Sequence, residues 1–338
     1  MDSFIAYELA FDCEAVTPMA LPRNKGSTLR GAFFGALRRD FCLNKSLISC
    51  RTCPTAAVCP ICRLVATVEK GGSRGEEVPR PFALKPVISN GLRWEAGDTF
   101  SFGLTLFGSA LSLFPYVVLA VRRMGETGMG DRAAAPGRFH IREARAVNPA
   151  SGIEKTIHRQ GESLVHVPDI PITHADVLAR ADSLPQDRVE LEIITPMRLI
   201  ISGSLVHRLS FRALVQRLLG RLTDLYRYCT DERLAMDFAG LLQKAEEVRV
   251  VEDGTRWLDL SSYSRRRDAR TPIGGLVGSI AFEGPLRDYL PLLVWGQFTQ
   301  VGKDVTKGNG WYRIAFSCGI PEHEPQVLRE GEAPDGPG

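Results

Sequence analysis

One order of secondary-structure elements is predicted twice along this 338-residue chain. In the first half, apolar residues alternate at 4–16, which predicts a strand, and recur four apart at 28–42, which predicts an amphipathic helix. Two strand-like runs, a second helix, a glycine-rich turn and a last strand follow. The second half repeats this order from residue 188 to residue 314. We therefore predict an α+β fold of two tandem ferredoxin-like (RRM-like, βαββαβ) domains.

The repeat also places the domain boundaries. We predict an N-terminal domain at 1–150, with a four-cysteine knuckle inserted at 50–62, and a C-terminal domain with a glycine-rich loop at 188–320. Residues 151–187, where Pro and Gly recur and the periodicity fades, are predicted to be a connector. Residues 321–338, rich in Pro, Gly and Glu, are predicted to be a disordered tail.

The charge distribution favours a phosphate-bearing partner. The formal net charge is only +3, but Lys and Arg gather at 22–45 and 263–313. Local basic clusters attract nucleic acid more strongly than a small overall excess would. An ordinary solvated surface is the alternative interpretation.

Hydropathy gives no sign of a membrane protein. The sequence has no uncharged apolar run of about 18 residues, the length that predicts a membrane-spanning helix. Its first residues are acidic and alternating, unlike the basic flank and apolar block of a signal peptide. We therefore expect a soluble, cytoplasmic protein without a membrane partner.

Four cysteines are spaced as two knuckles, C-x2-C-x5-C-x2-C, at Cys50, Cys53, Cys59 and Cys62. In a reducing compartment this pattern is more typical of metal ligands than of disulfides. Four thiolates suit a structural zinc with no coordination position left open for water. An iron–sulfur cluster is the alternative, because spacing does not distinguish the two.

The segment 300–316 combines glycines with lysines directly before a predicted strand. Exposed backbone N–H groups at Gly302, Gly308 and Gly310, with Lys303 and Lys307 beside them, could form an anion-binding nest. The segment is not a P-loop, because no Gly-Lys-Ser/Thr opens a helix.

Three stretches resemble one known family. Residues 272–314 contain Gly274-Gly275-x-x-Gly278, an apolar helix, and then Gly302-Lys303-x-x-Thr306-x-Gly308-x-Gly310. This pattern resembles the C-terminal signature of the CRISPR-associated endoribonucleases that process precursor crRNA, within the RAMP superfamily. "STLRGAFFGALRRDF" at 27–41 is similar to the early helix of that family. The segments at 194–200 and 210–226 resemble the strand and helix that open its second domain.

The resemblance implies how RNA is bound. In that family each half is ferredoxin-like, and the glycine-rich loop contacts the crRNA backbone. It also implies that a hairpin around residues 263–272 grips the base of a repeat stem-loop, to which arginine is suited because its fork pairs with phosphate and its plane stacks on bases. The residues that we therefore expect to bind RNA are Arg38, Arg39, Arg265, Arg266, Arg267, Arg270, Gly302, Lys303, Lys307, Gly308 and Gly310.

The resemblance also implies chemistry without a catalytic metal. In the family a 2′-hydroxyl attacks the scissile phosphate and leaves a 2′,3′-cyclic phosphate, which requires a base, a cation and an acid. Many relatives carry a Gly-His-Ala-Leu stretch in the early helix, whereas this chain reads Phe34-Gly35-Ala36-Leu37. The remaining candidates for catalysis are Lys25, Arg30, His140 and His207.

Three functions remain open at this point. The first is an endoribonuclease that cuts CRISPR repeat RNA at a hairpin and can stay bound to the crRNA within an effector complex. The second is a RAMP subunit of an effector complex that binds crRNA without cutting it, which the missing histidine favours. The third is an unrelated zinc-knuckle scaffold for protein partners, which explains the cysteines but not the glycine-rich loops.

Overall fold

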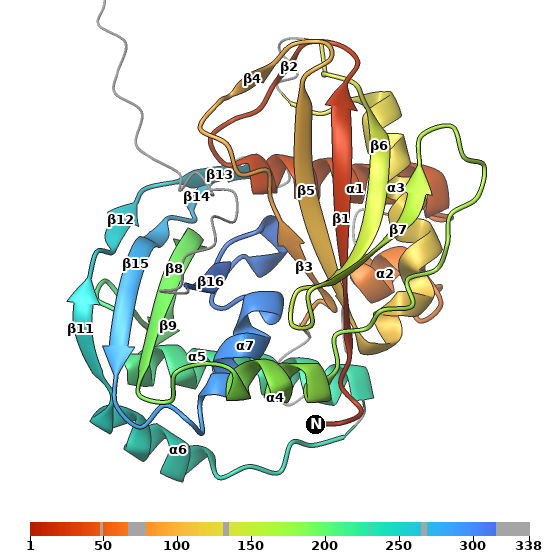
Figure 1. Cartoon of the computed structure of the whole chain (residues 1–338). Coiled ribbons are helices and arrows are strands. Elements are labelled where there is room, and N and C mark those ends of the chain that lie inside the picture. The colour runs from red at the N-terminus through yellow and green to blue at the C-terminus, as the bar shows by residue number, and fades with distance from the viewer. Residues whose placement is uncertain (48–49, 67–78, 131–134, 231, 265–268, 316–338) are drawn as a thin grey trace, which may run out of the picture.

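The computed structural model describes residues 1–47, 50–66, 79–130, 135–230, 232–264 and 269–315. None of the helices in these ranges is long and apolar enough to cross a membrane. The N-terminal half forms an antiparallel sheet in the order β3-β5-β1-β6-β7, with two helices packed on one face (Figure 1). Its elements are β1 (Ala6–Ala15), α1 (Lys25–Phe41), α2 (Pro60–Leu64), β3 (Phe82–Lys85), β5 (Thr99–Phe107), α3 (Phe114–Thr127), β6 (Phe139–Asn148) and β7 (Ile153–Arg159).

The C-terminal half repeats this topology in the order β11-β15-β8-β16, again antiparallel. A hairpin of β13 and β14 is inserted between β12 and β15, and the short helix η4 precedes the last strand. The elements are β8 (Arg188–Met197), α5 (Phe211–Thr230), α6 (Phe238–Lys244), β11 (Arg249–Asp253), β12 (Arg256–Leu258), β13 (Ser261–Ser264), β14 (Ala269–Pro272), β15 (Gly275–Glu283), α7 (Leu290–Thr299), η4 (Val305–Lys307) and β16 (Tyr312–Ala315).

Both sheets therefore have the strand order of a ferredoxin-like fold, in which the first and third strands lie in the middle and the second and fourth at the edges. The prediction of two tandem ferredoxin-like domains is confirmed. Local patterning explains why it could be read from the sequence: Leu9, Phe11 and Cys13 alternate into the core from β1, and Leu29, Phe33 and Leu37 recur on one face of α1. The side chain of Asn24 caps α1 by accepting a hydrogen bond from the Ser27 N–H.

The segment predicted to be a connector has secondary structure of its own. β7 pairs with β6 as a fifth strand of the first sheet. Helix α4 (His174–Asp182) packs against α7 of the second domain, where the Trp295 indole N–H donates to His174 Nδ1 at 3.2 Å. Residues 151–187 thus belong partly to each domain.

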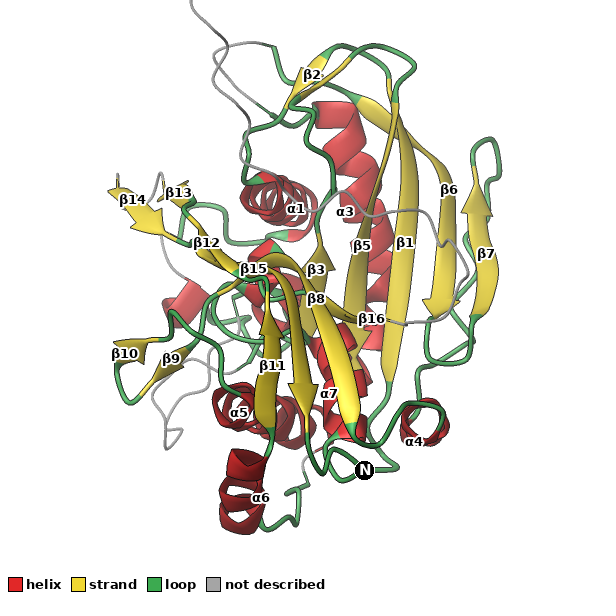
Figure 2. Ribbon diagram, turned by 60° about the vertical axis from the view of Figure 1, so that its left-hand side comes forward, coloured by secondary structure: helices red, strands yellow, loops and turns green. Residues whose placement is uncertain are grey.

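The described residues form two hydrophobic cores, and one of them joins the two domains. Phe4 and Phe107 from the N-terminal half pack with Tyr226 and Trp295 from the C-terminal half. The ring centroid of Phe4 lies 4.9 Å from that of Trp295 and 6.1 Å from that of Phe107. Helix α1 lies next to the η4 loop, and the β13–β14 hairpin lies beside α1 in both views (Figure 2).

Candidate nucleic-acid interface

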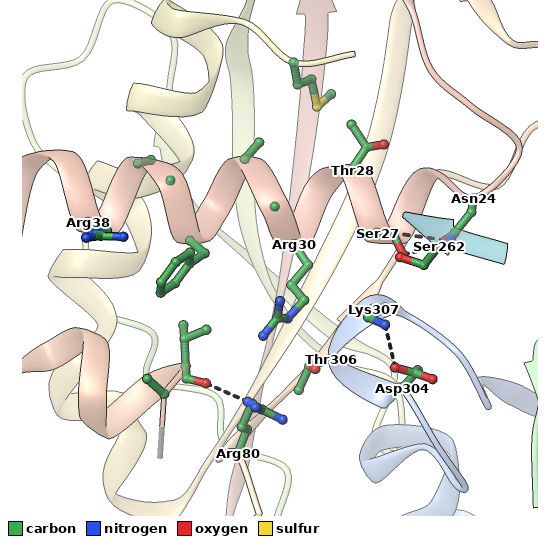
Figure 3. A pocket seen from close by; sticks show the side chains of 18 of the residues that line it. Asn24, Ser27, Thr28, Arg30, Arg38, Arg80, Ser262, Asp304, Thr306 and Lys307 are labelled. Atoms are coloured by element: carbon green, nitrogen blue, oxygen red, sulfur yellow. Dashed lines mark hydrogen bonds and ion pairs between the residues drawn. The ribbon is translucent and has the colours of Figure 1, made fainter. Parts of the chain in front are cut away.

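A groove of about 2060 Å³ lies between the two domains. The first domain lines it with one face of α1 and with the segment that carries the four cysteines, and the second domain contributes the η4 loop and the β13–β14 hairpin (Figure 3). This volume exceeds that of a typical small-molecule pocket, so the groove suits a polymer better than a small molecule.

The groove is strongly basic. Two acidic side chains, Asp259 and Asp304, line it among the described residues. The basic residues that line it are Arg23, Arg30, Arg38, Arg39, Arg80, Arg198, Arg221, Arg270, Lys303 and Lys307. A concave surface with this excess of positive charge attracts a polyanion and releases its counterions.

Helix α1 supplies the groove with hydroxyls at its start and guanidinium groups farther along. Ser27 and Thr28 occupy its first turn, and Arg30 projects toward the η4 loop (Figure 3). Arg38 donates to the backbone carbonyls of Lys45 and Leu47, at 2.9 and 3.1 Å. Of the residues predicted to bind RNA, Arg38 and Arg39 therefore lie in the groove, and Arg38 also holds the turn that follows the helix.

The glycines of the 302–310 loop have a different role from the predicted one. Gly308 and Gly310 are buried, and a Cβ on Gly310 would lie only 1.8 Å from the Val301 carbonyl oxygen. Both have positive φ, as does Gly302, whose added Cβ would lie 2.5 Å from the Arg198 carbonyl oxygen. None of these three glycines lines the groove. They allow the loop to pack closely against protein, not against phosphate.

The loop's backbone donors are also used within the protein. The N–H groups of Lys303, Gly308 and Gly310 donate to the carbonyls of Arg198, Val305 and Pro196. The expected anion nest is therefore not available at these positions. What the loop does present to the groove are side chains: Lys303 is exposed, Lys307 forms an ion pair with Asp304 at 2.8 Å, and Thr306 lies beside them.

The predicted hairpin is present, formed by β13 and β14 in antiparallel register. Arg270 lies exposed on β14 and lines the groove together with Ser262. Arg265, Arg266 and Arg267 lie outside the described residues. The hairpin thus places at least one of the four expected arginines at the groove.

The four cysteines line the same groove. Burial raises the pKa of the Cys62 thiol, and interactions with Cys50 and Cys59 raise it further. Cys53 differs: its sulfur accepts from Asn44 Nδ2 at 3.4 Å and lies 3.3 Å from the Thr55 hydroxyl, whose hydrogen bond lowers the Cys53 pKa. In the part of the chain that the structure describes, no three His, Cys, Asp or Glu side chains are arranged as a ready metal site. The zinc site, like its iron–sulfur alternative, stays a prediction.

Only one of the four expected catalytic residues, Arg30, lines the groove. Lys25 is buried elsewhere: its ammonium donates to the Ser89 carbonyl at 2.7 Å and lies 5.8 Å from the Trp94 ring centroid. Burial, with a smaller contribution from Arg23, lowers the Lys25 pKa to about 8. Its side chain nevertheless does not line the groove.

The two histidine candidates lie away from the groove. His140, on β6, has Nε2 3.9 Å from the Glu14 carboxylate. His207 packs on Trp257 with ring centroids 4.5 Å apart, and Arg198, which does line the groove, lies 5.8 Å above the same indole. No histidine in the described ranges lines the groove itself.

Sequence reasoning missed Arg80, Arg198 and Arg221, which line the groove. The sequence does contain a signal for Arg221. It lies on the face of α5 that otherwise carries core leucines, such as Leu218 and Leu225, and an arginine on such a face is a candidate functional residue. Arg80 had no comparable signal, since it follows a polar, glycine-rich gap.

The fold and the groove define a class: a protein of two ferredoxin-like domains with a basic groove between them. Comparison with known proteins narrows it. Residues 191–312 match the family described as CRISPR-associated endoribonuclease Cas6, and residues 4–170 match the AF_1859_N family, described as an N-terminal domain. The match over residues 191–312 confirms the resemblance to the CRISPR-associated endoribonucleases of the RAMP superfamily that the motifs indicated.

Solved structures show the same fold at low sequence identity. A Cas6 product complex matches with a TM-score of 0.53 and 13% identity, over 92% of this chain and 99% of that one. Thermus thermophilus Cas6 matches with a TM-score of 0.52 and 13% identity, over the same shares. A Cas6-RT-Cas1–Cas2 complex matches with a TM-score of 0.58 and 14% identity, over 96% of this chain and 31% of that one. No match was found among curated proteins.

Proposed function

We propose that this protein is an endoribonuclease that binds the repeat of a CRISPR precursor RNA in the interdomain groove and cuts it to release crRNA. The observation that carries this proposal is the basic groove itself, lined from both domains of a chain whose second domain matches the Cas6 endoribonucleases. The helix, hairpin and loop that the motif resemblance singled out all meet there.

The proposed reaction uses no catalytic metal. The 2′-hydroxyl of the RNA attacks the adjacent phosphate, the new P–O bond closes a 2′,3′-cyclic phosphate, and the 5′-oxygen of the next nucleotide leaves with a proton. Guanidinium groups in the groove would stabilise the charge that accumulates on the phosphate oxygens. Ser27 and Thr28 could hold the RNA at the start of α1 by donating hydrogen bonds.

Proton transfer in the groove takes place without an imidazole from the described residues. Arginine stays protonated and is a poor base, and no imidazole of the described residues lines the groove. A hydroxide ion or water would then take the 2′ proton, which predicts slow cleavage that accelerates with rising pH. A general acid–base pair typically contributes about 10²–10⁴ in rate, so its loss should reduce turnover to that extent.

The same observation favours a second candidate function. A groove that binds RNA but lacks an imidazole fits a subunit that holds crRNA without cutting it. With either function we propose complex formation with other CRISPR proteins, which is supported by the recurrence of the fold in a structure described as a Cas6-RT-Cas1–Cas2 complex.

One experiment separates the two candidates. Purified protein is incubated in EDTA with end-labelled RNA of its own repeat and with a copy that carries 2′-deoxyribose at the cut. Cleavage of the first RNA alone supports the endoribonuclease. Tight binding with both RNAs intact supports the holding subunit, and binding no tighter than to an unrelated RNA of equal length argues against both.

A further inference from the structure

Three arginines from distant parts of the sequence line the groove. Arg30 comes from α1, Arg80 from the loop before β3, and Arg221 from α5 of the second domain. Figure 3 shows Arg30 and Arg80 pointing into the same space between α1 and the η4 loop, with Thr306 beside them. The fold therefore brings guanidinium groups from both domains to the same groove.

Their hydrogen bonds within the protein leave donors unused. Arg80 Nε donates to the Val65 carbonyl at 2.6 Å, and Arg221 Nε donates to the Thr299 carbonyl at 3.3 Å. Arg30 Nε and Arg221 Nη2 are buried without a hydrogen-bond partner among the described residues. A buried donor without a partner costs about 1–3 kcal/mol, so such a group marks a position where a ligand can supply the missing acceptor.

The electrostatics of the cluster are those of an anion site. Burial lowers the pKa of Arg30 and of Arg221, that of Arg221 to about 10, and the charge of Arg80 contributes to both shifts, while Cys229 and Asp224 act on Arg221 in the opposite direction. Asp304, which raises the Arg30 pKa, is already paired with Lys307. Like charges held together with so little compensation are stabilised when an anion binds between them.

Phosphate is the anion that matches this geometry. A guanidinium presents a planar fork of N–H donors that pairs with two phosphate oxygens, and three forks can surround one phosphate group. Three other basic residues of the groove differ, because Lys303 and Arg270 are exposed and Lys307 is already paired. Those residues attract RNA in general, whereas the cluster can fix a single position.

We propose that Arg30, Arg80 and Arg221 together bind one phosphate group of the RNA and so set the register of the strand in the groove. This inference rests on the proposed function, since it assumes that the bound polymer is RNA. Arg80 is the member chosen for substitution, because its charge lowers the pKa of both other arginines and it comes from a segment that no motif identified.

The test replaces phosphates one at a time. Repeat RNA that is protected by 2′-deoxyribose at the cut is prepared with a single uncharged methylphosphonate at each linkage in turn, and its affinity is measured for the wild type and for Arg80→Ala. For the wild type, one linkage should lose about ten- to one-hundred-fold in affinity, the range expected for a phosphate held by several charged hydrogen bonds. For Arg80→Ala, the loss at that linkage should shrink at least threefold, while losses at other linkages stay the same.

Two further variants keep the test decisive. Arg122→Ala removes an arginine of α3 whose side chain is 74% exposed and which does not line the groove, so its profile should equal that of the wild type. If Arg80→Ala does not fold, Arg80→Lys retains the charge but not the fork, and the same loss of coupling at one linkage is expected.

The outcomes distinguish this inference from the function on which it rests. Identical linkage profiles for the wild type and the Arg80 variants would overturn the phosphate site and leave RNA processing intact. Failure of the wild type to bind unmodified repeat RNA would overturn the proposed function, and the phosphate site with it.

Discussion

A close contact between the two domains gives a quantitative prediction at Gly26. This residue lies in the first turn of α1, and a Cβ there would be 1.8 Å from the Lys307 carbonyl oxygen of the η4 loop. Because that neighbour is backbone, no side-chain rotation can relieve the clash. Overpacking of this kind typically costs about 1–3 kcal/mol, and the clash would push α1 and the loop apart at the edge of the groove.

The matched control is Gly220→Ala on α5. A Cβ at that position meets nothing within 4 Å, and the residue does not line the groove. Replacing glycine by alanine in a helix interior stabilises a protein by about 1 kcal/mol, so the free energies of unfolding of Gly220→Ala and Gly26→Ala should differ by about 2–4 kcal/mol.

Denaturant titrations with both variants measure that difference directly, and repeat-RNA binding reports on the groove. We expect Gly26→Ala to be less stable than the wild type and to bind RNA more weakly, while Gly220→Ala is more stable and binds RNA normally. Equal stabilisation by the two substitutions would refute the inferred close contact between α1 and the η4 loop.

Three other predictions follow from the site and the core. Gly35 lines the groove, and a Cβ added there would meet nothing within 4 Å. Gly35→His should therefore raise the cleavage rate at least tenfold near neutral pH, and an unchanged pH–rate profile would show that the imidazole takes no part. Elemental analysis should find one equivalent of zinc in the purified wild type and none in the double variant Cys53→Ser, Cys59→Ser. Visible absorption would instead indicate an iron–sulfur cluster, and a metal-free wild type would refute the site. His174 accepts a hydrogen bond from Trp295, and burial lowers the pKa of His174. Because the unfolded chain then binds more protons than the folded protein, the free energy of unfolding should fall as the pH drops below about 6.5. Urea titrations of His174→Gln should show a weaker dependence of stability on pH.

The sequence could predict the architecture because periodicity is a local signal. The alternation that defines β1 and the four-residue spacing that defines α1 lie within a few turns of the chain, and each element occurs where it was expected. The hairpin of β13 and β14 was predictable for the same reason. β7 was not, since four of its seven residues are exposed and its position at the sheet edge depends on pairing with β6.

The roles of the functional residues were harder to predict from the sequence, because they depend on the direction in which each side chain points. The sequence does not show whether Gly310 lacks a side chain so that a phosphate or so that the Val301 backbone can approach it. In the structure Gly310 is buried, and the Val301 backbone occupies that space. Lys25 and Arg30 lie five positions apart on one helix, yet only Arg30 faces the groove. Arg80 and Arg221 meet through the tertiary fold, which no local pattern encodes.

The position of Phe4 also bears on how such proteins can diverge. The two family matches divide the chain between residues 170 and 191, as if the halves were separable modules. Phe4, however, stacks against Trp295 in a core that both halves share. A hybrid assembled from the halves of two relatives would inherit one of these rings without its partner, so the halves are expected to be exchanged between lineages only together.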